Sequence, residues 1–327
     1  MRPHNGRRVA IVGAGVSGLT CAVLFAEHGH PTTIIARESG QRTTSAAAAA
    51  IWFPYDAAPA DRVIAWSLET LTVLQELSRD PAAGVQVVEL RVFARMGEID
   101  APQWARALGA RRLASAEVPA GVFTSGYALH VPVVDTTIYL DYLTQRARAA
   151  GALFRDDEIG ALEEIDTQHE VIVNCSGADA KTLVGDAHVE PHRGQVAVVA
   201  KLELPYAIVC DDPPLMYAIP RRNDCVLGGT NQISDSRKIA PDDTARIVSE
   251  AARVLGITAP AVVLERVGLR PFRRIGVRLE AEQLCDGRKL IHNYGHGGSG
   301  FTLSWGCAAA VLVLCDSPLA ETARPLT

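Results

Sequence analysis

The feature of the sequence that most constrains the fold is a glycine pattern near the N-terminus, G-x-G-x-x-G at residues 13–18. The preceding apolar run, residues 8–12, is typical of a fully buried strand, and a helical pattern follows over about 16–28. A second apolar run, residues 32–36, comes after Gly29, which ends the helix. Strand, glycine turn, helix and strand together predict a β-α-β unit in a parallel sheet with a right-handed crossover.

The three glycines also predict a ligand. The first permits a tight turn, the second lets the backbone approach a pyrophosphate, and the third allows the helix to pack closely on the strand. The helix N-terminus adds unpaired N–H groups and a partial positive charge. The alternative is a glycine turn that binds no ligand. The position of the glycine pattern between a strand and a helix favours a dinucleotide-binding turn.

An acidic residue about 20 positions after the glycines commonly binds the ribose hydroxyls of such a dinucleotide. Here the second strand ends Ala36-Arg37-Glu38. Either Glu38 binds the ribose one position late, or Arg37 contacts the adenosine end instead. A solvated surface charge is the alternative interpretation of Arg37.

The rest of the chain alternates between two kinds of pattern. Short alternating strands, typical of an antiparallel sheet, cover about 84–134 and resume between 195 and 228, whereas strand–turn–helix order returns at 290–315. We therefore predict an α/β fold in which a Rossmann-like nucleotide-binding domain is interleaved with an α+β substrate domain built on an antiparallel sheet. The expected limits are 1–60, 135–190 and 286–327 for the nucleotide domain, and 61–134 and 191–285 for the substrate domain.

Charge and composition exclude several classes of protein. The chain has 32 basic and 37 acidic residues, a formal net charge of −5, which argues against binding to nucleic acid or to an anionic membrane surface. No apolar run approaches the roughly 18 residues that span a bilayer, and we see no signal peptide. Seven scattered cysteines without a C-x-x-C pair indicate reduced thiols and no zinc site. We expect a cytoplasmic protein; the oligomeric state stays open, with a homodimer as one alternative.

Residues 42–55, RTTSAAAAAIWFPY, combine a hydroxyl-rich turn with five alanines. The alanines are either a helical turn of the core, or small side chains that let backbone N–H groups approach a flat, negatively polarised ring. After a Rossmann-type unit, this segment resembles the D-amino-acid oxidase family of flavoproteins. Further segments agree in order, and the resemblance spans nearly the whole chain: 174–177 (NCSG), 193–195 (RGQ), 267–271 (VGLRP) with 278–280 (RLE), and 292–302 (HNYGHGGSGFT).

The resemblance implies non-covalently bound FAD in the Rossmann-like domain, and no metal. It implies oxidative deamination of D-amino acids by hydride transfer to the flavin, with oxygen as electron acceptor and a 2-oxo acid, ammonia and hydrogen peroxide as products. The residues expected to bind FAD are Gly13, Ala14, Gly15, Val16, Ser17, Gly18, Arg37, Glu38, Thr43, Thr44, Ala49, Ala50, Ile51, Trp52, Ser176, Gly177, Gly297, Gly298, Ser299, Gly300, Phe301 and Thr302.

The resemblance also implies how the substrate is held. Arg270 matches the family's carboxylate-binding arginine, and a guanidinium suits that role because it makes two parallel charge-assisted bonds; a structural salt bridge is the alternative. Tyr217 matches the tyrosine that donates its hydroxyl to the same carboxylate. Gly298 matches the position whose carbonyl contacts the amine, and Tyr55 and Phe53 complete the expected pocket.

No residue is expected to act as a general acid or base, because an amine delivered neutral can lose hydride directly. His292 and His296 fit hydrogen bonds that stabilise the turn better than catalysis.

Two departures from the family pattern bear on specificity. Pro213 stands where relatives often carry a lid tyrosine, which predicts a more open or differently gated entrance. Phe53 stands where some relatives have a polar residue, so the pocket should be more apolar. No second arginine is evident for an acidic side chain unless Arg221 or Arg222 provides it. We expect neutral or apolar D-amino acids to be preferred over D-aspartate.

Several alternatives to this function stay open. The same fold could oxidise D-aspartate, glycine or a cyclic secondary amine. From a different class, the chain could be a non-catalytic flavin binder or a nicotinamide-dependent dehydrogenase.

Overall fold

The computed structural model describes residues 6–318, and two β-sheets organise them. The first sheet has six strands in the order β14-β15-β7-β1-β2-β6, in which only β14 and β15 pair antiparallel. Its central strand, β1, is buried along its whole length, and the predicted parallel β-α-β unit is confirmed. The strands are β1 (Val9–Val12), β2 (Thr32–Ala36), β6 (Leu153–Asp156), β7 (Val171–Asn174), β14 (Arg278–Gln283) and β15 (Lys289–Tyr294).

The second sheet has nine strands in the order β12-β8-β11-β10-β9-β3-β5-β4, with β13 paired to β8. Among the described strands of this sheet, β3 and β9 form the single parallel pair, so the expected antiparallel sheet is confirmed. The strands are β3 (Val85–Ala94), β4 (Arg111–Arg112), β5 (Ser125–Val134), β8 (Val189–Ala200), β9 (Ala207–Cys210), β10 (Met216–Pro220), β11 (Asp224–Gly228), β12 (Gln232–Ile233) and β13 (Val262–Arg273).

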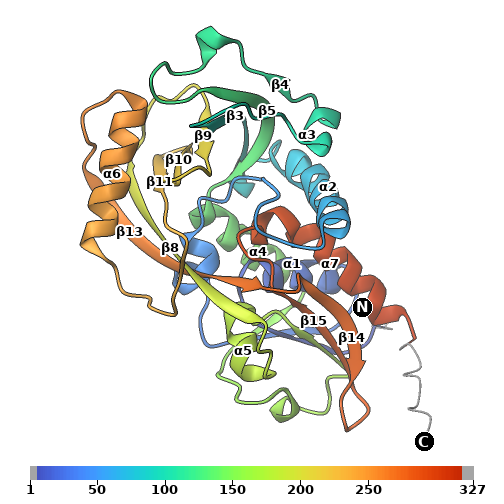
Figure 1. Cartoon of the computed structure of the whole chain (residues 1–327). Helices are drawn as coiled ribbons and strands as arrows, with labels where there is room; N and C mark the ends of the chain where they lie inside the picture. Colours follow the sequence, from blue (N-terminus) through green and yellow to red (C-terminus); the bar gives the residue numbers. More distant parts are fainter. Residues whose placement is uncertain (1–5, 319–327) are drawn as a thin grey trace, which may run out of the picture.

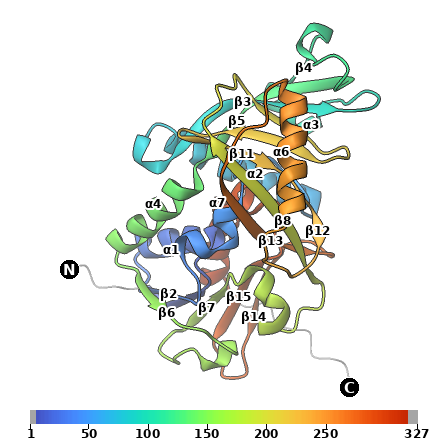
Figure 2. The same ribbon diagram turned by 90° about the vertical axis from the view of Figure 1, so that its left-hand side faces the viewer.

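The long helices divide between the two sheets. Helices α1, α2, α4 and α7 pack together near the first sheet, where α1 contacts both α4 and α7, and α2 contacts α7. Helix α6 lies instead against β8, β10 and β11 (Figure 1), and Figure 2 shows α1 and α4 above the strands β2, β6 and β7. The helices are α1 (Val16–Glu27), α2 (Ala60–Leu77), α3 (Gln103–Ala107), α4 (Thr136–Ala149), α5 (Ala180–Leu183), α6 (Pro241–Leu255) and α7 (Gly300–Asp316).

The chain passes between the sheets repeatedly, as the interleaved pattern predicted. β1 and β2 belong to the first sheet, β3 to β5 to the second, β6 and β7 to the first, and β8 to β13 to the second. The expected boundary after residue 285 does not match this path, because β14 already forms an antiparallel hairpin with β15 in the first sheet. The boundary expected after residue 190 likewise falls inside β8.

Two further observations bear on the expectations from composition. Across residues 6–318 no helix combines the length and the apolar character needed to cross a bilayer. All seven cysteines are free thiols, and six of them are buried.

Candidate active site

A pocket of about 680 Å³ is lined by segments of both sheets, a volume within the range of roughly 300–1,000 Å³ usual for small-molecule sites. Most residues expected at the site lie in its lining. They are Gly13, Ala14, Gly15, Val16, Ser17, Arg37, Glu38, Thr43, Thr44, Ala49, Ala50, Ile51, Phe53, Tyr55, Ser176, Gly177, Tyr217, Arg270, Gly297, Gly298, Gly300, Phe301 and Thr302.

Gly13 and Gly18, at the turn between β1 and α1, have no room for a side chain. Gly13 has a φ of +107°, and a Cβ there would lie 2.5 Å from the carbonyl oxygen of Cys175. A Cβ on Gly18 would lie 1.9 Å from the carbonyl oxygen of Gly13. Gly18 is therefore absent from the lining: it lets α1 pack under the turn and does not itself reach the pocket. The first turn of α1 contains no acidic residue, so its positive N-terminal end faces the pocket uncompensated.

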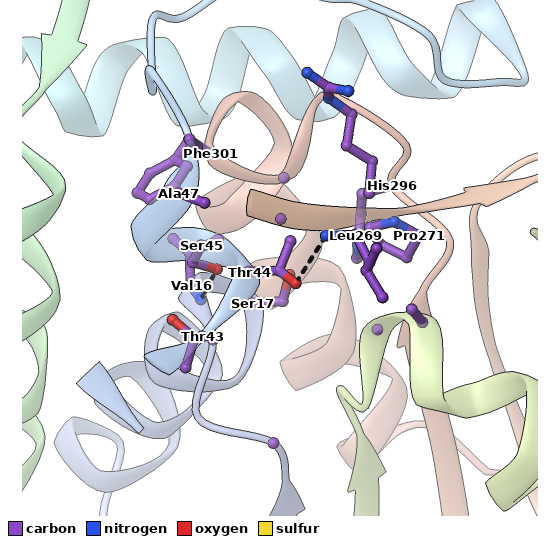
Figure 3. Close-up of a pocket in the computed structure, with 18 of the residues that line it drawn as sticks. Val16, Ser17, Thr43, Thr44, Ser45, Ala47, Leu269, Pro271, His296 and Phe301 are labelled. Carbon is purple, nitrogen blue, oxygen red and sulfur yellow. Dashed lines mark hydrogen bonds between the residues drawn. The ribbon is translucent and has the colours of Figure 1, made fainter. Parts of the chain in front are cut away.

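The alanine-rich segment lines the pocket mainly with small side chains. Only its first part is helical, a short 3-10 turn over Thr44–Ala47, and residues 47–50 border the cavity. Ser45 Oγ accepts a hydrogen bond from the backbone N–H of Val16 at 2.9 Å, and Thr44 Oγ1 accepts one from Leu269 at 3.3 Å, which links this segment to both domains (Figure 3). Of the two interpretations of the alanines, the structure favours small side chains that let the backbone approach a flat ligand, and not a helical turn of the core.

Trp52 does not contribute to the lining, contrary to expectation. Its side chain is 1% exposed, and its indole N–H donates to the carbonyl of Ser67 at 2.9 Å. An indole nitrogen is a donor only, and burial requires that it find such an acceptor. Trp52 therefore packs into the core beside α2.

The glycine-rich turn before α7 is clamped to the segment at residues 53–55. Ser299 Oγ accepts the N–H of Tyr55 at 2.7 Å and also hydrogen-bonds the Tyr55 carbonyl, so this side chain, expected at the cofactor, turns away from the pocket. Thr302 Oγ1 makes the corresponding pair with Phe53, at 3.1 and 3.0 Å. A Cβ on Gly298 would lie 2.6 Å from the Tyr55 ring, which explains the glycine there.

Arg270, on β13, has a guanidinium without an anionic partner. Nη1 donates to the carbonyl of Thr230 at 2.9 Å, and within the described part of the chain no carboxylate oxygen lies within the 4.0 Å of a salt bridge. The guanidinium lies against Gly194, where a Cβ would be 2.4 Å from Nη1. The structural salt bridge considered for Arg270 is thereby contradicted.

Tyr217 brings a hydroxyl to the same place. Its ring lies over Gly228 and Gly229, and a Cβ on Gly228 would be 1.9 Å from Cζ. Burial raises the pKa of Tyr217, and the charge and hydrogen bond of Arg270 partly offset that rise. The phenol therefore stays protonated at neutral pH, as a donor beside a cation.

Arg37 and Glu38 lie at the opposite end of the pocket, and both are already paired. Arg37 donates to Glu158 at 2.7 Å and to Asp179 at 3.1 Å, and these contacts raise its pKa. Glu38 pairs with Arg237, which comes from the loop before α6, at 2.8 Å. The local sequence carries no signal for Arg237, because it is 199 positions from Glu38.

The two histidines of the last strand and turn are neutral. His292 is fully buried and hydrogen-bonds Glu282 at 2.9 Å, and burial lowers its pKa. His296 borders the pocket and bonds the Asn293 side chain at 3.0 Å, and burial lowers its pKa to about 4. These hydrogen bonds agree with the structural interpretation.

The other two arginines considered for an acidic substrate do not reach the pocket. Arg221 pairs with Asp224 at 2.6 Å, and Arg222 donates to the Pro81 carbonyl at 3.1 Å.

The sequence interpretation missed several lining residues. Val209, Leu215 and Ile219 could have been found from the alternation of strand residues around Tyr217, whereas Asp211 lies beyond the end of β9 and carried no such signal. Lining residues within segments already singled out include Ser45, Ala47, Ala48, Cys175, Gly194, Gly268, Leu269, Pro271, Asn293 and His296.

Comparison with known proteins agrees with this geometry. The sequence matches the FAD dependent oxidoreductase family over residues 8–312. It is 41% identical to a D-amino-acid oxidase of Rubrobacter xylanophilus over 98% of this chain and 99% of that protein. It is 40% identical to a D-amino-acid oxidase of Streptomyces coelicolor, over 92% of this chain and 94% of that protein. A human D-aspartate oxidase is 33% identical over 92% of each chain.

Solved structures share the fold. The glycine oxidase of Geobacillus kaustophilus superposes with a TM-score of 0.79 at 20% identity, covering 95% of this chain and 94% of that one. The nicotinamide-dependent alternative finds no support in these matches. The glycine turn before α1 and the small side chains of residues 47–50 leave room for FAD, the cofactor that the family description names. The chain belongs to the FAD dependent oxidoreductase family.

Proposed function

We propose that this chain oxidises D-amino acids to 2-oxo acids, with release of ammonia and reduction of oxygen to hydrogen peroxide. The observation that carries the proposal is the pairing of Arg270 and Tyr217 in the pocket that the glycine turn opens into. A guanidinium without a carboxylate partner and a protonated phenol together form an anion site that matches an α-carboxylate. The relatives named D-amino-acid oxidase, identical at 34–41%, support the same substrate class.

FAD would occupy the part of the pocket that is lined by the turn before α1, residues 47–51 and the start of α7. The N–H groups at the start of α1 would hold the pyrophosphate. The backbone of residues 47–51 and the start of α7 would hold the ring system, because glycines and alanines leave it room. Bound FAD supplies the acceptor for the hydride that leaves Cα.

The residues of the chain orient the substrate for that transfer. Arg270 binds the carboxylate with two parallel N–H bonds, which fix rotation as well as position, and Tyr217 donates a third. The carbonyl of Gly298 would accept a hydrogen bond from the amine, which enters the site neutral after losing its proton to solvent, and this contact would turn Cα toward the flavin. His296 is already hydrogen-bonded to Asn293 and is neutral, so it takes no proton in this scheme.

The direct test is a peroxide assay of the FAD-reconstituted protein over both enantiomers of a broad amino-acid panel. We expect turnover of D-isomers, and bleaching of the flavin absorbance by the same D-isomers without oxygen. Turnover restricted to L-isomers, or to glycine, would overturn the proposal. Bleaching also distinguishes an oxidase from a non-catalytic flavin binder, which would stay yellow.

A preference for neutral or apolar side chains over D-aspartate is part of this proposal. Phe53 lines the pocket, and Arg221 and Arg222 are occupied elsewhere. Among residues 6–318, the other arginines of the lining, Arg37 and Arg237, are already paired with carboxylates, so Arg270 is the one unpaired arginine available to an acidic substrate. The same panel measures this preference as the ratio of kcat/KM for D-alanine and D-aspartate.

A further inference from the structure

Strands β9 and β10 present alternate residues to the pocket. Val209 lines it from β9, and Leu215, Tyr217 and Ile219 line it from β10 and the preceding turn. The intervening residues, Cys210, Met216 and Ala218, pack into a separate hydrophobic cluster on the other face. Asp211, which lies beyond the end of β9, also lines the pocket.

The next residue, Asp212, has a different environment. Its carboxylate accepts the backbone N–H of Arg95 at 2.7 Å, and its backbone carbonyl accepts from Nε of the same arginine. Asp211, in contrast, has neither a salt bridge nor a side-chain hydrogen bond to any residue between 6 and 318. The hydrogen bonds to Arg95 thus account for Asp212, whereas Asp211 faces the pocket without a partner among the described residues.

The field around Asp211 is negative. Asp211 is an exposed residue that lines the pocket. Partial desolvation of its carboxyl by the pocket walls, with Asp212 and Asp56 nearby, raises the pKa of Asp211, and its charge in turn contributes to the raised pKa of Tyr55. A cation placed against Asp211 would reverse these shifts.

The cations of the pocket lie elsewhere. Arg37 and Arg237 are paired with carboxylates at the far end. Arg270 is beside Tyr217, where the proposed carboxylate site lies. A substrate held by Arg270 would therefore meet, on the same sheet face, one carboxylate that no cation of the described residues neutralises.

We propose that Asp211 forms an anionic subsite for the substrate side chain, so that D-amino acids with a cationic side chain, of the D-arginine and D-lysine class, are preferred substrates. The proposal rests on the proposed function and deepens it. The two ends of such a substrate match the two charges of the site: Arg270 takes the α-carboxylate and Asp211 takes the side-chain guanidinium or ammonium. Acidic side chains are repelled by the same carboxylate.

The test uses substrate pairs that differ in charge and little in shape. The FAD-reconstituted protein is assayed for peroxide with D-arginine against D-citrulline, and D-lysine against D-norleucine. We expect kcat/KM to favour the cationic member of each pair by about tenfold to a hundredfold, the range of a charge-assisted hydrogen bond. In Asp211→Asn that ratio should fall to near one through loss of turnover of the cationic member. The matched control, Asp212→Asn, should keep the ratio of the unmodified protein.

Two outcomes would overturn the proposal. A ratio near one in the unmodified protein, or a ratio unchanged in Asp211→Asn, would show that Asp211 does not bind the side chain. Equal losses for both members of a pair are one form of the unchanged ratio, and they would place Asp211 at the α-amine.

A binding measurement separates this inference from the proposed function. 6-Aminohexanoate has the carboxylate and terminal ammonium of lysine without an α-amine, so it cannot be oxidised; hexanoate is its neutral-tail match. We expect 6-aminohexanoate to raise the melting temperature more than hexanoate does, and Asp211→Asn to remove the difference. If no D-amino acid is oxidised but this difference appears, the proposed function fails while the anionic subsite stands. If D-norleucine is oxidised and no difference appears, the subsite fails alone.

Discussion

The two ends of the pocket each carry an arginine, and the two arginines are in opposite states. At the end of β2, the Arg37 side chain is 46% exposed and already pairs with Glu158 and Asp179. At the other end, Arg270 donates to a backbone carbonyl and forms no salt bridge with any residue between 6 and 318. An exposed ion pair contributes only about 0–1 kcal/mol, whereas a partly buried guanidinium without an anion keeps its full interaction for a ligand. The pairing state, and not the residue type, therefore distinguishes Arg270, the arginine proposed to bind substrate, from Arg37.

The sharpest test of this comparison is Arg270→Ala. We expect kcat/KM for a D-amino acid to fall by about 3 kcal/mol, or roughly a hundredfold, because a charged hydrogen-bond partner of the carboxylate is lost. Flavin absorbance should be retained, because the cofactor contacts lie elsewhere. Arg222→Ala, which removes an exposed arginine outside the pocket, is the matched control. An unchanged kcat/KM in Arg270→Ala would remove this residue from the site.

A smaller effect is expected when Arg270 is displaced but not removed. In Gly194→Ala the new Cβ would lie 2.4 Å from Nη1, so the guanidinium must move. Displacement by about 1 Å is expected to lower kcat/KM by roughly tenfold to a hundredfold. Combining Gly194→Ala with Arg270→Ala is the control: if Gly194 acts through the guanidinium, its additional effect disappears in the double variant. Fully additive losses would contradict that role.

A still smaller loss of kcat/KM is expected for Tyr217→Phe. It removes one neutral hydroxyl and keeps the ring over Gly228 and Gly229. A neutral hydrogen bond contributes about 1 kcal/mol, so kcat/KM is expected to fall about fivefold, with the melting temperature nearly unchanged. No change in kcat/KM would mean that the hydroxyl does not reach the substrate carboxylate.

The smallest effect is expected at the other end, for Arg37→Ala. Because this side chain is exposed and already neutralised, the dissociation constant of FAD should rise by less than about fivefold. Titration of the apoprotein with FAD, followed by flavin fluorescence, measures this constant. A much larger rise would show that Arg37 contacts the adenosine end directly, as one of the sequence interpretations held, and would remove the contrast with Arg270.

The main units of the fold were predictable because their signals are local. The apolar run of β1, the glycine turn and the helical pattern of α1 lie within about 20 consecutive residues, and each has one common structural solution. β14 was assigned to the wrong unit because its exposed, charged sequence carries little apolar periodicity, and its pairing with β15 places it in the first sheet.

At the site, the limit of prediction was side-chain direction. Thr43, Thr44 and Phe53 line the pocket as expected, whereas Trp52 and Ser299 point away from it. Around Trp52 the chain is extended, and neighbouring side chains of an extended segment face opposite ways, so a correct prediction for Phe53 does not apply to Trp52. Ser299 stands at the N-cap of α7 and is turned away by its hydrogen bonds to Tyr55. Asp211 was missed because Asp211 and Asp212 are indistinguishable in sequence and differ only in what they face.

The amino-acid sequence by itself determined the β-α-β unit, the dinucleotide turn and the family, because backbone conformation at glycines and apolar periodicity are properties of short segments. Only the tertiary structure decided which arginine lacks an anion, which aspartate faces the pocket and to which sheet β14 belongs. Those outcomes depend on partners far along the chain, such as Arg237 for Glu38 and Thr230 for Arg270. Electrostatic interactions and side-chain direction are set by such distant contacts, which no local pattern encodes.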